Sequence, residues 1–248
     1  MNLPNLLIVG AAKSGTTSLH NYLKQHPDIF MSNHKEPHFL INNEIGINRI
    51  PKGINNLQDY SNLFSNGASY KYRGESSAMY LQFPEIAIKN IDRYLDEDVK
   101  IIIMLRNPIE RAFSGYQHVK RYNLDEDLDF EDALEISEQR YFTNNNITPA
   151  SRYIHIGMYN EFVRKFKTKF KTNVHIIIYK DFINNTNQEL SRLFSFLGIK
   201  DVQIDFNKQY MVGGWKWKND LFRKIFMKRH FLKKFIPFKR LIKAAFKS

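Results

Sequence analysis

The chain lacks cysteine, so it forms neither disulfide bonds nor thiolate metal sites. It also lacks the run of about eighteen or more apolar residues that a membrane-spanning helix needs. Its eight histidines show no zinc-ligand spacing such as H-E-x-x-H. The first apolar stretch begins at Leu6, and we expect no signal peptide before it. These absences predict a cytoplasmic protein without a metal site.

The composition of the 248-residue chain, 43% hydrophobic and 25% charged, suits a globular domain with a full core. Apolar runs of strand length alternate with amphipathic stretches of helix length, an alternation typical of α/β domains. We expect strands at 6–10, 99–105 and 173–179, and helices at 16–25, 57–64, 85–95, 129–140, 152–171 and 188–197. The prediction is one domain, 1–214, with a central, mainly parallel sheet flanked by helices.

The N-terminal strand runs into a turn typical of phosphate-binding sites. The apolar run from Leu6 breaks at Gly10, and a helical pattern begins at Thr16. Such a turn directs several backbone N–H groups at one anion, and the helix dipole favours negative charge there. We predict a P-loop-like strand-loop-helix. Its phosphate-binding residues are Lys13, Ser14, Gly15, Thr16, Thr17 and Ser18.

This turn differs from the common nucleotide-binding loop, which reads G-x-x-x-x-G-K-[ST]. Here Lys13 precedes Gly15, and no lysine follows that glycine in the loop. The lysine should therefore approach a phosphate chain from another side. An alternative interpretation is an ordinary strand-to-helix turn, in which the glycines only allow tight packing.

A second segment of the same kind follows the apolar run 99–105. Asn107 suits a helix cap and Pro108 suits the first turn of a helix. Arg106 is then at the carboxyl end of a parallel strand, the edge where open α/β sheets bind ligands. Ser114 follows two turns into the helix. Arg106 and Ser114 together suit a second phosphate.

The two segments resemble those of sulfotransferases that use 3′-phosphoadenosine 5′-phosphosulfate (PAPS). The resemblance covers roughly residues 5–200 and is closest to the carbohydrate type, which includes the heparan sulfate sulfotransferases and many bacterial members. It implies that residues 13–18 bind the 5′-phosphosulfate, and that Arg106 and Ser114 bind the 3′-phosphate. It also implies PAPS as co-substrate without a metal. The Golgi members of the family carry an N-terminal membrane anchor. No such anchor is recognisable in this sequence, so we expect a bacterial member.

A third segment carries the resemblance further. Lys35-Glu36-Pro37-His38-Phe39-Leu40 is similar to the family pattern K-E-x-x-F-F, with Leu40 in place of the last aromatic residue. The resemblance implies that Glu36 is the general base, which takes the proton of an acceptor hydroxyl as the new S–O bond forms. The alternative is that Lys35 and Glu36 form a solvated charged pair at a strand end.

A fourth segment departs from the family. In the heparan sulfate enzymes a lysine follows the glutamate that Glu75 resembles, and here that position is Ser76. Either Lys13 stabilises the developing charge alone, or another cation substitutes. Glu75 itself has two interpretations, as a carboxylate that orients the acceptor or as a structural residue at a strand end.

The C-terminal segment 215–248 holds twelve Lys or Arg and one acid, Asp220, and so carries +11 of the net charge of +12. Cations alternate there with large apolar residues, as in an amphipathic helix on an anionic membrane. Alternatively the segment packs on the domain with its cations in water. The resemblance implies a C-terminal segment that closes the nucleotide pocket, with Lys216 or Lys218 on the 3′-phosphate and Trp215 over the adenine. The tryptophans would otherwise anchor the segment at a membrane interface.

These features together predict a PAPS-dependent sulfotransferase that acts on a hydroxyl, or less favourably an amine, of a glycan or glycolipid. We expect peripheral contact with the inner face of an anionic membrane through 215–248, and no nucleic-acid partner, because no nucleic-acid module is recognisable. Two alternatives stay open: a nucleotide-dependent small-molecule kinase, and a membrane-surface binding protein with an inactive site.

Overall fold

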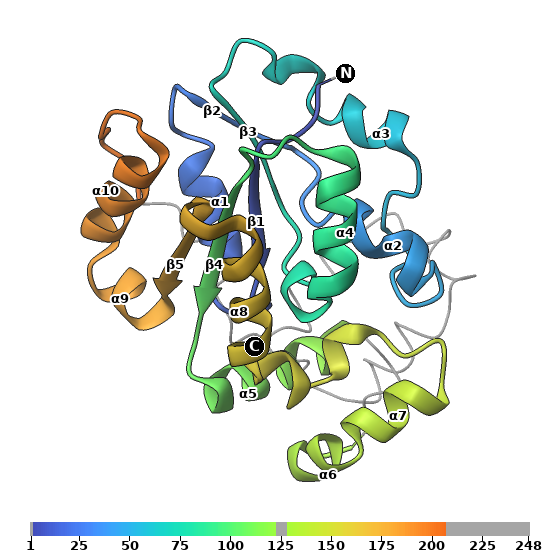
Figure 1. The fold of residues 1–248 in the computed structure, drawn as a ribbon. Helices are drawn as coiled ribbons and strands as arrows, with labels where there is room; N and C mark the ends of the chain where they lie inside the picture. Colours follow the sequence, from blue (N-terminus) through green and yellow to red (C-terminus); the bar gives the residue numbers. More distant parts are fainter. Residues whose placement is uncertain (1, 123–127, 207–248) are drawn as a thin grey trace, which may run out of the picture.

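A computed structural model describes residues 2–122 and 128–206 of the chain (Figure 1). Its centre is a five-stranded sheet with the order β2-β3-β1-β4-β5, in which every neighbouring pair is parallel. The strands are β1 (Leu6–Gly10), β2 (Ile29–Met31), β3 (Tyr72–Ser76), β4 (Lys100–Leu105) and β5 (Val174–Ile178). The predicted α/β class with a mainly parallel sheet is confirmed.

Helices cover both faces of the sheet, which makes three layers (Figure 1). They are α1 (Thr16–Leu23), α2 (Phe39–Ile45), α3 (Leu57–Asn62), α4 (Pro84–Tyr94), α5 (Pro108–Tyr122), α6 (Phe130–Glu135), α7 (Ser137–Thr143), α8 (Tyr159–Phe170), α9 (Tyr179–Asn184) and α10 (Thr186–Leu197). Strand β1 is buried along its whole length, and its side chains alternate between the two faces. Leu7 and Val9 contribute to the core beneath α2, α4 and α8, and Leu6 and Ile8 contribute to the core beneath α1 and α10.

The strand order places the two predicted phosphate segments together. Strands β1 and β4 are hydrogen-bonded neighbours although about ninety residues separate them in sequence, and the Ala11 N–H donates to the carbonyl of Met104 at 2.7 Å. The loops after β1 and β4 therefore leave the same sheet edge side by side. From β1 the chain passes to β2 at one edge of the sheet, and from β4 it passes to β5 at the other edge. Connections that leave two neighbouring strands in opposite directions open a ligand crevice at the carboxyl edge.

Several predicted elements change in the structure. The single helix predicted at 129–140 is wrong: it is two short helices, α6 and α7, because Ile136 leaves helical geometry between them. The helix predicted at 152–171 is also too long. Only Tyr159–Phe170 is α-helical, and single turns of 3₁₀-helix precede it at Pro149–Ser151 and His155–Gly157. No residue range was predicted for strands β2 and β3 or for helices α2 and α9.

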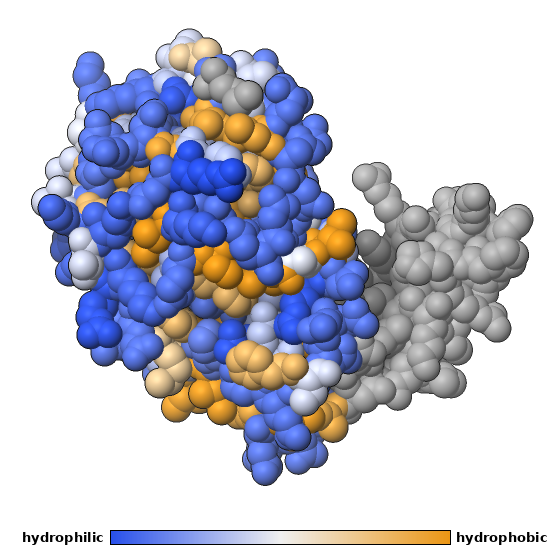
Figure 2. All heavy atoms as spheres, turned by 45° about the vertical axis from the view of Figure 1, so that its right-hand side comes forward, coloured by the Kyte–Doolittle hydropathy of each residue, from blue (hydrophilic) through white to orange (hydrophobic). Residues whose placement is uncertain are grey.

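No helix in residues 2–122 or 128–206 is both long enough and apolar enough to cross a membrane. The face of the molecule in Figure 2 is mostly hydrophilic, with hydrophobic side chains gathered in small groups between the polar ones. The predicted basic segment 215–248, with Trp215, Lys216 and Lys218, lies outside the described residues.

Candidate active site

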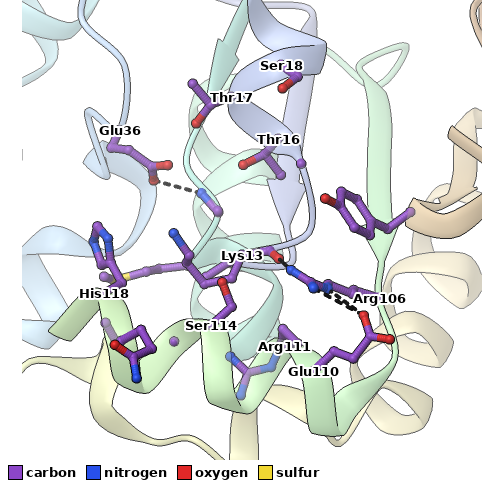
Figure 3. A pocket seen from close by; sticks show the side chains of 18 of the residues that line it. Lys13, Thr16, Thr17, Ser18, Glu36, Arg106, Glu110, Arg111, Ser114 and His118 are labelled. Carbon is purple, nitrogen blue, oxygen red and sulfur yellow. Dashed lines mark hydrogen bonds and ion pairs between the residues drawn. The ribbon is translucent and has the colours of Figure 1, made fainter. Parts of the chain in front are cut away.

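A cleft of about 1070 Å³ opens at the carboxyl edge of the sheet, above the ends of β1 and β4 (Figure 3). It brings together most of the predicted site. Lining residues that the sequence singled out are Lys13, Gly15, Thr16, Thr17, Ser18, Glu36, Arg106 and Ser114. Segments that are far apart in the chain thus meet around one cavity, as the two-phosphate interpretation requires.

The loop after β1 has the backbone geometry of an anion cradle. Lys13 and Gly15 both adopt left-handed backbone angles, with φ of 70° and 90°, and α1 begins directly afterwards at Thr16. Gly15 is needed for a second reason, because a Cβ there would lie 3.0 Å from the ring of Tyr179. The first-turn N–H groups of α1 have no intrahelical acceptor and lie at the cleft.

Ser14 is placed differently from its neighbours in the loop. It is fully buried, its side chain is not among those lining the cleft, and its N–H donates to the carbonyl of Ala11 at 3.2 Å. Thr16, Thr17 and Ser18 lie along the start of α1 with their hydroxyl groups at the cavity (Figure 3). Lys13, Thr17 and Ser18 therefore present functional groups to the cleft, whereas Ser14 supports the loop from beneath.

Lys13 projects into the centre of the cleft (Figure 3). Burial, followed by the positive charges of Arg121, Lys35 and Arg106, lowers the pKa of its ammonium to about 8. A lysine surrounded by other cations and by few acids is in an environment built for an anion.

Arg106 lies on the opposite side of the loop. Its guanidinium stacks over the ring of Tyr179 at 4.7 Å and contacts the carboxylate of Glu110, with Nε and Nη2 each 3.1 Å from the same oxygen. Ser114 lines the cleft from α5, the helix that follows Arg106. Both residues that the sequence assigned to the second phosphate thus line the cleft.

Glu36 faces this cluster from the loop between β2 and α2. One oxygen accepts a hydrogen bond from the Ala78 N–H at 2.9 Å and lies 3.4 Å from Nε2 of His38, and the other contacts the ammonium of Lys35. Burial alone would raise the pKa of Glu36, but Lys35, His38 and the Ala78 N–H outweigh it and hold the pKa below its usual value. The carboxylate is therefore ionised and able to accept a proton.

Three basic residues of α5 line the cleft and had no assigned role in the sequence: Arg111, His118 and Arg121. Together with Ser114 they fall at intervals of three or four residues, which places them on one helical face. This spacing, counted from Ser114, is the sequence signal that could have identified the three residues as part of the site. Burial lowers the pKa of His118 to about 4, and Lys13 and Arg121 contribute, so its imidazole is neutral at pH 7.

Glu75 and Ser76 turn away from the cleft. Glu75 is fully buried in strand β3 and accepts hydrogen bonds from three hydroxyl groups, which matches its structural interpretation. Ser76, where the family has lysine, has its hydroxyl 2.9 Å from Nδ1 of the buried His20. Lys35, the lysine of the K-E-x-x-F-F pattern, lies at the cleft, where its ammonium contacts Glu36. No group of three or more potential metal ligands occurs in the part of the chain that the structure describes.

The chain belongs to the sulfotransferase family, a class of group-transfer enzymes: the family model of the sulfotransferase domain matches residues 3–216. A crystal structure of a sulfotransferase from Alicyclobacillus acidocaldarius is similar, with a TM-score of 0.76 and 33% identity over 86% of this chain and 88% of that one. A mouse sulfotransferase solved with 3′-phosphoadenosine 5′-phosphate (PAP), SULT7A1, shares the fold with a TM-score of 0.52 and 19% identity, covering 82% of this chain and 62% of that one.

Two relatives have names that refer to carbohydrate substrates. Carbohydrate sulfotransferase 15 of Mus musculus is 24% identical in an alignment of 249 positions, gaps included, which covers 79% of this chain and 44% of that protein. The human bifunctional heparan sulfate N-deacetylase/N-sulfotransferase 2 is 29% identical over 203 residues, covering 79% of this chain and 22% of that protein. The chain thus spans less than half the length of these relatives.

Proposed function

We propose that the protein transfers a sulfuryl group from PAPS to a hydroxyl group of a carbohydrate. The observation that carries the proposal is the pairing of two cationic loops, at Lys13 and at Arg106, with a carboxylate, Glu36, across one cleft. Two loops suit a donor with phosphate at both the 5′ and 3′ positions, and the carboxylate suits an acceptor that must lose a proton. Names of relatives support a glycan acceptor, and the SULT7A1 complex supports the nucleotide.

In the proposed reaction, the acceptor oxygen attacks sulfur in line with the bond to the bridging oxygen of the 5′-phosphate. Glu36 takes the acceptor proton as the new S–O bond forms and the old one breaks. Negative charge then grows on the bridging oxygen, and PAP leaves. Lys13 and the N–H groups of residues 15–17 would stabilise that charge, by the kind of preorganised electrostatic stabilisation that usually contributes most. Arg106 and Ser114 would hold the 3′-phosphate, and Trp215 with Lys216 would close over the nucleotide.

The decisive experiment is calorimetric titration of the purified chain with PAP, and separately with ATP and Mg²⁺. We expect PAP to bind, and Arg106→Ala to weaken that binding at least tenfold. Binding of ATP alone would instead favour the small-molecule kinase, although the lysine of the common nucleotide loop is missing after Gly15. Binding of neither would overturn the proposal and favour an inactive site.

The acceptor class is tested by transfer of radiolabelled sulfate from PAPS to a panel of oligosaccharides that differ in free hydroxyls and in amines. We propose hydroxyl over amine, and glycan or glycolipid over small phenols. Label on a phenol such as p-nitrophenol, with none on any sugar, would overturn the carbohydrate assignment.

Peripheral membrane contact through 215–248 is a separate proposal, supported by the concentration of cations in that segment. The full chain should sediment with vesicles that contain phosphatidylserine and not with phosphatidylcholine vesicles, and salt should reverse the binding. Equal behaviour with both vesicle types would contradict it.

A further inference from the structure

The segment that carries Glu36 has an unusual backbone. Glu36 and His38 both adopt left-handed angles, with φ of 62° and 53°. Residues with a side chain rarely adopt this region, and they keep it only where surrounding contacts determine it. The position of the Glu36 carboxylate therefore depends on whatever fixes the backbone from residue 36 to the start of α2.

Three N–H groups of this segment are held by the end of β3 and the turn after it. The Glu36 N–H donates to the carbonyl of Ser76 at 2.9 Å. The His38 N–H donates to the hydroxyl of Ser77 at 3.0 Å, and the Leu40 N–H donates to the hydroxyl of Tyr80 at 3.3 Å. Two of the three acceptors are thus side-chain hydroxyl groups, which rotate unless something orients them.

Glu75 orients both hydroxyl groups. Ser77 donates to one of its oxygens at 2.8 Å, and Tyr80 donates to the other at 2.7 Å. With their hydrogens directed at the carboxylate, Ser77 and Tyr80 present lone pairs to the N–H groups of His38 and Leu40. Glu75 has no solvent-exposed surface, so these bonds form in a low-dielectric environment where they are strong.

A third hydroxyl completes the cluster but, in the part of the chain that the structure describes, makes no hydrogen bond to the backbone of the Glu36 segment. Tyr60, on α3, donates to Glu75 at 3.1 Å and is fully buried. Its ring stacks on Phe39 with 4.3 Å between centroids, a contact that phenylalanine would keep. Tyr60 and Tyr80 therefore make the same kind of bond to the same carboxylate, and only Tyr80 passes it on to a backbone N–H of the segment.

We propose that Glu75 is a positioning residue for the general base, and that it fixes the Glu36 segment through the hydroxyl groups of Ser77 and Tyr80. This rests on the proposed function, in which Glu36 takes the acceptor proton. Glu75 itself touches neither the donor nor the acceptor, because its side chain lies beneath the cleft and not in its lining. A displacement of about 1 Å in a reacting group can cost as much as a hundredfold in rate.

The test compares Tyr80→Phe and Ser77→Ala with the matched control Tyr60→Phe, using labelled PAPS and the oligosaccharide that the wild-type protein sulfates best. We expect kcat to fall about tenfold or more in Tyr80→Phe and Ser77→Ala and to stay within about twofold of wild type in Tyr60→Phe. The Kd for PAP should be the same in all three. Wild-type turnover in Tyr80→Phe or in Ser77→Ala, or an equal loss of kcat in Tyr60→Phe, overturns the proposal.

A second measurement does not need activity. Amide hydrogen exchange in the peptide 36–45 should be faster in Tyr80→Phe than in Tyr60→Phe, because only the former removes an acceptor of an N–H in that segment. Equal exchange in the two variants overturns the positioning role. A wild-type protein without transfer activity would overturn the proposed function instead, and the exchange comparison would still test whether the Tyr80 hydroxyl holds the Glu36 segment.

Discussion

Arg106, which lies between β4 and α5, is paired with Glu110 in the first turn of α5, and both of its contacting nitrogens lie 3.1 Å from one carboxylate oxygen. A phosphate bound by Arg106 must share the guanidinium with this acid or displace it. Glu110 is 60% exposed and can rotate into solvent, so the competition is modest.

Glu110→Gln should therefore tighten PAP binding. Exposed pairs four residues apart on a helix contribute about 0.3–0.5 kcal/mol, which corresponds to roughly a twofold lower Kd. Titration calorimetry at low and at high salt measures it, and the gain should shrink as salt screens the charges. Weaker binding in Glu110→Gln would mean that Glu110 orients Arg106 and does not compete for it.

Glu36→Gln should remove the proposed base without disturbing the nucleotide. General-base catalysis contributes about 10²- to 10⁴-fold, so kcat should fall by that order while the Kd for PAP stays close to wild type. Single-turnover sulfate transfer separates the two quantities. Near-normal turnover would exclude Glu36 as the base.

The lowered pKa of Lys13, about 8, predicts the pH dependence of nucleotide binding. In the ligand-free protein the ammonium loses its proton as the pH rises through about 8, and a bound anion raises the pKa again. Affinity for PAP should therefore decline above pH 8, with net proton uptake on binding. Calorimetry at pH 8.5 in buffers of different ionisation enthalpy detects that proton, and Lys13→Met should abolish the uptake.

Arg111 is a buried cation, and two of its guanidinium nitrogens have no hydrogen-bond partner among the described residues. It has no exposed surface, its Nη2 donates to the carbonyl of Tyr153, and Nε and Nη1 have no hydrogen-bond partner among the described residues. Burial lowers its pKa. An unpaired buried charge destabilises a fold by several kcal/mol, which an anion in the adjoining cleft would partly offset.

Arg111→Met should thus melt no lower than wild type in the absence of ligand, and it should gain less thermal stability from saturating PAP. Scanning calorimetry with and without PAP measures both. A variant that melts well below wild type and keeps the full PAP-induced shift would show that Arg111 is structural only.

The sequence predicted what depends on local pattern. The loop after β1 and the start of α5 were predicted because glycine, proline and capping residues act on their immediate neighbours. Strand β4 was predicted because its four central residues, 101–104, are apolar and buried. The break at Ile136 was not predicted because no glycine or proline marks it, and strand β2 was not predicted because three residues are too few to show a periodicity.

The site was predictable to the same degree. Lys13, Glu36 and Arg106 belong to motifs of adjacent residues and all line the cleft. The role of Glu75 was not determined by its neighbours in sequence, because its partner Tyr60 comes from a helix that only tertiary folding brings to β3. Ser14, chosen for its place in the motif, has a buried side chain, since the left-handed residues on either side turn it away from the cavity.

The pairing of β1 with β4 also determines how much of the chain must be synthesised before the cleft can form. The cleft draws its walls from residues between Ala12 and Thr186, and its two cationic loops meet only after β4 pairs with a strand made about ninety residues earlier. Such distant pairings form late and slowly. A ribosome-bound chain that ends before β4 carries the complete first loop and yet has no second loop to place beside it. Binding of the proposed nucleotide by a nascent chain would therefore show that β1 and β4 have already paired.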